Sequence, residues 1–176
     1  MKALMLNGNV LEYVPDELKL NKEIVSIAIS QDGYALKYAP KEITKDKKFI
    51  ESIVKKSNDI FLMRYINKGL FTGKELNSLS SNLFLRKKIQ SDMTLKNYKY
   101  KMGINKDINI FNYDTNCSKG GMYFTNEKYV NDFSDQDYGS DIYEIKLPDD
   151  AQIFLEDYNK AKSNKIEIAK RISILQ

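Results

Sequence analysis

The chain has 176 residues, of which 42% are hydrophobic and 30% charged, and its formal net charge at pH 7 is +4. This balance is typical of a folded globular protein. No stretch approaches the roughly 18 consecutive apolar residues of a membrane-spanning helix, so we expect no membrane partner. The charge is weaker than that of a dedicated nucleic-acid-binding protein, which leaves nucleic acid a secondary candidate.

The chain contains no histidine and a single cysteine, Cys117. The lack of histidine excludes Ser-His-Asp and Cys-His catalysis and zinc sites built on imidazole. One cysteine excludes an intrachain disulfide and a Cys-rich metal cluster. We therefore expect an intracellular protein of a reducing compartment, without a metal site.

The first third of the chain contains an internal repeat. A shift of 25 residues aligns seven identical pairs, among them Gly8 with Gly33 and Tyr13 with Tyr38. The same shift predicts a third, partial copy with Asn58 at the glycine position and Phe61 at the following leucine position. Repeats of this length bury their apolar faces against one another, so the tyrosines either pack between repeats or form an exposed row that faces a ligand.

Each copy is predicted to be helical. Ile24 and Ala28 recur at helical spacing before Gly33, which ends that helix. Pro40 can start a further turn. Asp46 is predicted to cap the next helix, whose apolar face includes residues 49, 50 and 53.

The segment EIVSIAISQDGYALKYAPKEITKDKKFIESIVKKS resembles DUF4116, a short helical repeat of unknown function found in giant viruses and some bacteria. The resemblance covers about residues 3–63 and implies an architecture without a chemistry. An array of helical repeats offers an extended docking surface. We expect Tyr34, Tyr38 and Phe61 to be its binding residues, provided that their side chains are exposed.

A junction is predicted at residues 64–82, where glycine, serine and asparagine interrupt the apolar pattern. We place the domain boundary near residue 75, with a helical repeat region at 1–75 and an α+β module at 76–176. The fold class is therefore α+β, with short helical repeats packed on a mixed module. The predicted strands of the module are 83–85, 97–101, 121–125, 141–147 and 151–155, with a short helix at 126–133, a loop at 108–112, and either a strand or a basic helix at 165–175.

Residues 83–170 resemble the module that precedes ankyrin repeats in many giant-virus proteins, although this chain carries no ankyrin array. The resemblance rests on a motif that includes Asn105, Asp107, Cys117, Gly120, Gly121, Tyr123 and Phe124. Cys117 precedes Lys119, whose charge favours a thiolate, but a structural loop is the preferred interpretation of this segment and of its glycine pair.

The sequence Gly121-Met122-Tyr123-Phe124-Thr125 also resembles a strand of ADP-ribosyltransferases. This resemblance implies that Tyr123 stacks on the nicotinamide of NAD and that Glu144 or Glu156 orients the ribose. The first-strand histidine or arginine of that family is missing, because residues 98–101 offer only tyrosine and lysine.

The preferred function is a non-enzymatic adaptor that binds a host or viral protein in the host cytoplasm or in the virion, without a cofactor. The alternative is an NAD-binding enzyme similar to ADP-ribosyltransferases, or a degenerate relative of one. A third hypothesis assigns nucleic-acid binding to the basic run at residues 160–171.

Overall fold

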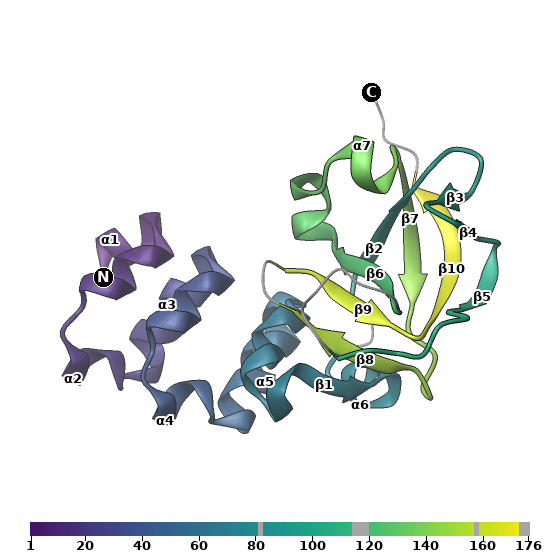
Figure 1. Cartoon of the computed structure of the whole chain (residues 1–176). Coiled ribbons are helices and arrows are strands. Elements are labelled where there is room, and N and C mark those ends of the chain that lie inside the picture. The colour runs from purple at the N-terminus through teal and green to yellow at the C-terminus, as the bar shows by residue number, and fades with distance from the viewer. Residues whose placement is uncertain (81–82, 114–119, 157–158, 173–176) are drawn as a thin grey trace. The chain divides into compact units, whose positions relative to one another are not determined.

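The computed structural model describes residues 1–80, 83–113, 120–156 and 159–172 (Figure 1). It contains two compact units, the repeat unit (residues 1–68) and the sheet unit (residues 69–176). Short helices form the repeat unit and an antiparallel sheet dominates the sheet unit. The predicted α+β class is therefore confirmed.

The repeat unit alternates α-helical and 3₁₀-helical segments. Its elements are α1 (Lys2–Leu6), η1 (Gly8–Tyr13), α2 (Asp16–Lys19), α3 (Lys22–Gln31), η2 (Gly33–Tyr38), α4 (Lys41–Thr44), α5 (Lys47–Ser57) and η3 (Ile60–Tyr65). A short 3₁₀ turn, η4 (Asn67–Gly69), leads into the sheet unit.

The 3₁₀ helices η1, η2 and η3 begin at the same kind of cap. The side-chain oxygens of Asn7, Asp32 and Asp59 each accept a hydrogen bond from the backbone N–H two residues ahead, at 2.9, 2.9 and 3.1 Å. Such caps satisfy N–H groups that a helix start leaves without an intrahelical partner. In all three copies a tyrosine follows the cap by six residues and ends the 3₁₀ helix.

The predicted register of the third copy is wrong. Its cap, Asp59, follows Asp32 by 27 residues and not by the expected 25. One extra residue lies in α5, which is longer than α3, and the other is Asn58, which stands between α5 and the cap. Asn58 ends α5 in the left-handed region, at φ 55°, which asparagine tolerates better than most residues. Phe61 therefore occupies the place of Tyr34 in the second copy, and not the leucine place.

Two aspartates join neighbouring repeats while they cap their own helices. Asp32 caps η2 with one carboxylate oxygen and accepts a 2.7 Å hydrogen bond from the Asn9 side chain with the other. Asp46 caps α5 through the backbone N–H of Phe49 at 3.0 Å, as predicted, and its second oxygen lies 2.5 Å from Lys22 Nζ. The hydrogen bond from Lys22 is the main cause that lowers the pKa of Asp46.

The described residues of the sheet unit form ten strands, of which eight make one antiparallel sheet in the order β1-β8-β9-β6-β2-β7-β10-β5. Figure 1 shows β7 between β2 and β10. Strands β3 and β4 form a separate hairpin. The bounds are β1 (Leu70–Thr72), α6 (Gly73–Asn77), β2 (Leu85–Ile89), β3 (Thr94–Leu95), β4 (Tyr98–Lys99), β5 (Gly103–Lys106), β6 (Met122–Asn126), η5 (Glu127–Asp132), α7 (Asp135–Tyr138), β7 (Asp141–Lys146), β8 (Gln152–Leu155), β9 (Ala161–Ser163) and β10 (Lys165–Ile172).

Most strands follow the predicted pattern. Strands β6, β7 and β8 and the helical turn η5 are confirmed, and the ambiguous C-terminal stretch is the strand β10. Strand β2 differs, because it begins at Leu85 and contains the basic residues 86–88 that were expected to follow a strand.

The predicted boundary near residue 75 lies within α6. The backbone N–H groups of Gly73 and Lys74 donate hydrogen bonds to the carbonyls of Ala151 and Asp149, at 2.9 and 3.0 Å. A capping box between Thr72 and Glu75, the third residue of α6, fixes the start of this helix. These bonds attach α6 to the sheet unit.

Candidate functional site

A tyrosine occupies the same position in each copy of the repeat unit. Tyr13, Tyr38 and Tyr65 are the last residues of η1, η2 and η3 and follow their caps at the same distance. Tyr13 is 81% exposed, and the other two side chains are half-buried. We call these three residues the tyrosine row. The sequence left open whether the tyrosines pack between repeats or are exposed. Tyr13 is exposed.

Cationic side chains accompany the row. Lys37 Nζ lies 4.6 Å from the ring centroid of Tyr38, and the guanidinium of Arg64 lies 4.9 Å from that of Tyr65. A hydrogen bond with Tyr38 is the largest cause that raises the pKa of Lys37, and the charges of Glu12 and Tyr65 raise this pKa further. Lys37 therefore lies within electrostatic range of groups from the first and third repeats.

A groove with a volume of about 570 Å³ opens beside Tyr38. We call it the inter-repeat groove, because α2 and its end form one wall and the start of α4 the other. Its lining residues are Asp16, Glu17, Lys19, Leu20, Tyr38, Pro40 and Glu42.

Apolar and acidic side chains line the groove, and we call Leu20, Tyr38 and Pro40 its floor and Glu17 and Glu42 its rim. Leu20 is 52% exposed, although it is a large apolar residue. Lys19 forms an ion pair with Asp16 at 3.1 Å. Glu17 and Glu42 are exposed and form no ion pair within the described part of the chain.

The predicted binding residues have different surroundings. Tyr38 belongs to the tyrosine row and lines the groove. Tyr34 is half-buried, with the Arg64 guanidinium 5.0 Å from its ring centroid. Phe61 is 1% exposed and therefore cannot contact a partner in this conformation, because its place in the third copy faces inward. Sequence reasoning missed Tyr65, which the constant spacing from cap to tyrosine would have revealed.

In the sheet unit, Lys160 lies between Tyr123 and Glu156 and contacts both. Lys160 Nζ is 4.8 Å from the Tyr123 ring centroid and 3.2 Å from Glu156 Oε2. The fully buried Lys162 places its Nζ 3.6 Å from Glu156 Oε1. Burial raises the pKa of Glu156, an effect that the attraction of Lys160 and Lys162 opposes.

The pocket beside Tyr123 is small. Its volume of about 20 Å³ holds roughly one water molecule, whereas a nicotinamide ring needs far more. Lys160 faces the tyrosine ring on which a nicotinamide would stack. The geometry therefore gives the NAD-binding alternative little support in this conformation.

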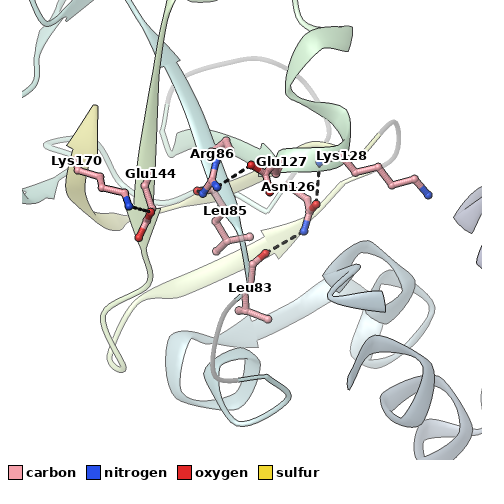
Figure 2. A network of polar contacts seen from close by, with 8 residues as sticks. All are labelled: Leu83, Leu85, Arg86, Asn126, Glu127, Lys128, Glu144 and Lys170. Atoms are coloured by element: carbon pink, nitrogen blue, oxygen red, sulfur yellow. Dashed lines mark hydrogen bonds and ion pairs between the residues drawn. The ribbon is translucent and has the colours of Figure 1, made fainter. Parts of the chain in front are cut away.

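Glu144 belongs to a different set of polar contacts (Figure 2). Its Oε2 lies 3.3 Å from Lys170 Nζ, and its register partner on β2 is Arg86, which forms an ion pair with Glu127 at 3.0 Å. Glu144 lines a pocket that does not include Tyr123. Of the two carboxylates proposed to assist Tyr123, the structure brings only Glu156 close to it.

Lys87 is a buried cation that the sequence did not single out. It is 3% exposed and lies on the same face of β2 as the buried Leu85 and Ile89. Its Nζ donates a 2.7 Å hydrogen bond to the Tyr123 carbonyl and lies 4.8 Å from the Tyr100 ring centroid. Burial is the main cause that lowers the pKa of Lys87 to about 7.

The polar motif residues Asn105 and Asp107 form hydrogen bonds with backbone groups of the sheet unit. Asn105 is buried, accepts a hydrogen bond from the Lys101 N–H at 2.9 Å, and donates to the carbonyls of Lys101 and Gly103 at 2.7 and 2.9 Å. Asp107 accepts hydrogen bonds from the Asn109 N–H and from the backbone N–H of Gly121. The Asp107–Gly121 hydrogen bond connects the end of β5 to the start of β6, whereas the Asn105 bonds hold the segment that enters β5.

The glycine pair of the motif is shaped by close packing. A Cβ at Gly120 would lie 2.3 Å from the Ile110 carbonyl oxygen, and one at Gly121 would lie 3.0 Å from the Lys162 side chain. Phe124 is buried in the core of the sheet unit. Cys117 lies outside the described residues.

Neither a metal cluster nor a membrane span is present in the described ranges. No group of three or more Cys, Asp or Glu side chains there could hold a metal ion. No helix described here is long and apolar enough to cross a membrane.

Comparison with known proteins supports the first resemblance. Residues 1–44 and 28–71 each match the family model of DUF4116, a domain of unknown function. An uncharacterized protein of Acanthamoeba polyphaga mimivirus is 31% identical over 77 residues, which are 43% of this chain and 24% of that protein. The chain thus spans about a quarter of the length of this relative. No solved structure matches the chain. The resemblance of residues 83–170 to the module that precedes ankyrin repeats stays a prediction.

Proposed function

We propose that this chain is an adaptor that binds a host or viral protein through its repeat unit, in the cytoplasm of an infected host or in the virion. The observation that carries the proposal is the tyrosine row with the inter-repeat groove beside it. The similarity to a giant-virus protein supports a viral origin. It specifies no activity.

The row has the chemistry of a protein interface. Tyrosine supplies a large, rigid contact surface at low conformational entropy cost and is enriched among interface residues that dominate binding. Tyr13 is 81% exposed, so its ring contributes little to the folded core. An aromatic side chain repeated at one position of successive repeats offers a partner several anchors at once.

Site-specific photo-cross-linking tests this proposal. A photoreactive phenylalanine analogue replaces Tyr13 or Tyr38, and the protein is irradiated in host-cell lysate. The control carries the same analogue at Lys48, an exposed position of α5 outside the groove. We expect one partner to be captured from both tyrosine positions and not from the control.

A Tyr13→Ala/Tyr38→Ala variant should lose most of that partner in co-purification and keep its circular dichroism spectrum. Identical capture from all three positions, or a partner retained by the double variant, would contradict the proposal.

A further inference from the structure

We infer that the inter-repeat groove binds a basic segment of a partner protein and takes an arginine or lysine side chain beside Glu17 and Glu42. This inference rests on the proposed docking function and specifies the chemistry of the partner.

The groove is large enough to take a long side chain of a partner. Its volume of about 570 Å³ falls within the range of roughly 300–1,000 Å³ that is typical of small-ligand clefts. It lies wholly in the repeat unit, between the first and second repeats, so one compact unit supplies every lining residue.

The floor of the groove matches the stem of a long basic side chain. Leu20, Pro40 and the ring of Tyr38 supply apolar surface. Arginine and lysine bury their methylene stems on such surface and keep the charged end near polar groups. The Lys37 ammonium already lies 4.6 Å from the Tyr38 ring centroid, so Tyr38 contributes apolar surface and the carboxylates supply the attraction for a cation. Lys37 is not among the lining residues of the groove.

The charges of the rim select a cation. Three carboxylates and one ammonium line the groove, so its net charge is −2 in a chain whose net charge is +4. The one ammonium, Lys19, is paired with Asp16. Glu17 and Glu42 are left to meet an incoming cation, and they would repel phosphate and therefore nucleic acid.

The acidic rim is specific to the first two repeats. Glu17 and Glu42 each follow the tyrosine of their repeat by four residues. The third repeat has Gly69 at this position. The pair of carboxylates therefore arises only where the first repeat adjoins the second.

Fluorescence anisotropy of the full chain with labelled peptides tests the inference. The probes are a short arginine-rich peptide and a peptide of the same length in which glutamate replaces every arginine. The test variant is Glu17→Gln/Glu42→Gln, which keeps side-chain shape and removes both charges. The matched control is Glu23→Gln, an exposed glutamate of α3 outside the groove.

We expect the wild-type chain to bind the arginine peptide and not the glutamate peptide. The double variant should bind about five- to tenfold more weakly, as two solvent-exposed ion pairs would predict, and the control should match wild type. Binding should also weaken as salt is added.

Three results would overturn the inference: equal binding of the two peptides, unchanged binding by the double variant, or no binding of the arginine peptide at millimolar concentration. The proposed function fails separately, when the tyrosine variants keep their cross-linked partner. A partner that depends on Tyr13 and Tyr38 but not on Glu17 and Glu42 would leave the docking function standing and refute the basic segment.

Discussion

Replacing Lys87 with methionine should stabilise the sheet unit, and the gain should depend on pH. The folded protein releases the Lys87 proton near pH 7, whereas the unfolded chain releases it near the ordinary value of 10.5. Between these values the unfolded state binds more protons, so the free energy of unfolding rises with pH. Below about pH 7 the full cost of charging the buried amine is present.

The magnitude follows from the pKa difference. A drop from 10.5 to about 7 corresponds to about 5 kcal/mol at 1.36 kcal/mol per pKa unit. Methionine also removes the hydrogen bond to the Tyr123 carbonyl, which offsets about 1 kcal/mol of the gain. Lys87→Met should therefore be more stable than wild type near pH 6. This advantage should shrink by roughly 1.4 kcal/mol per pH unit above pH 7.

Urea unfolding followed by circular dichroism measures the difference in the free energy of unfolding between Lys87→Met and wild type. The measurements run from about pH 6 to about pH 9, which is below the range in which tyrosine titrates. Lys146→Met, at an exposed position of β7 in the same sheet, is the control. A carbon-13 NMR titration of the lysine ε-carbons should show one signal with a midpoint near 7 that Lys87→Met removes. An advantage that does not vary with pH, or no such signal, would refute the reasoning.

Substitutions at four further positions test other contacts by thermal and urea unfolding. Glu156→Ala should cost about 3–5 kcal/mol, because it leaves the ammonium of the fully buried Lys162 without its carboxylate. Glu144→Ala, which breaks a more exposed pair, should cost at most about 1 kcal/mol, and equal losses would contradict this contrast. Gly73→Ala should lower the melting temperature markedly, since its Cβ would lie 1.9 Å from a backbone carbonyl oxygen of the turn before β8; an unchanged temperature would show that the turn moves freely. Asp32→Ala should cost about 1 kcal/mol through the lost cap, and Asp32→Asn should restore most of it.

Local sequence signals predicted the repeat unit well. Helix caps act within a few residues, so the role of Asp46 could be read directly from its place before an apolar helical face. The register of the third copy could not, because it depends on one added helical residue and on the left-handed conformation of Asn58. That error hid Tyr65. The expectation that Phe61 binds a partner was conditional on its exposure, and its burial rules this role out in this conformation.

The sheet unit was less predictable where burial and charge conflict. The strand around Ile145 alternates clearly, and both it and the strand around Phe124 were expected. Strand β2 was not, because three successive basic residues argue against a buried strand. Its structure instead depends on distant groups: the Tyr123 carbonyl for Lys87 and Glu127 for Arg86. The inter-repeat groove was also missed, since it exists only when residues of two repeats meet.

The aspartates that serve two repeats at once have a consequence for how the array unfolds. Since Asp32 and Asp46 each hold a group of the preceding repeat, loosening one repeat removes both its own cap and a bond of its neighbour. In a linear array the stability is close to a sum of terms for each repeat and each junction. The shared carboxylates increase the share of the stability that comes from the junctions and decrease the share that comes from single repeats. The repeats should therefore unfold together.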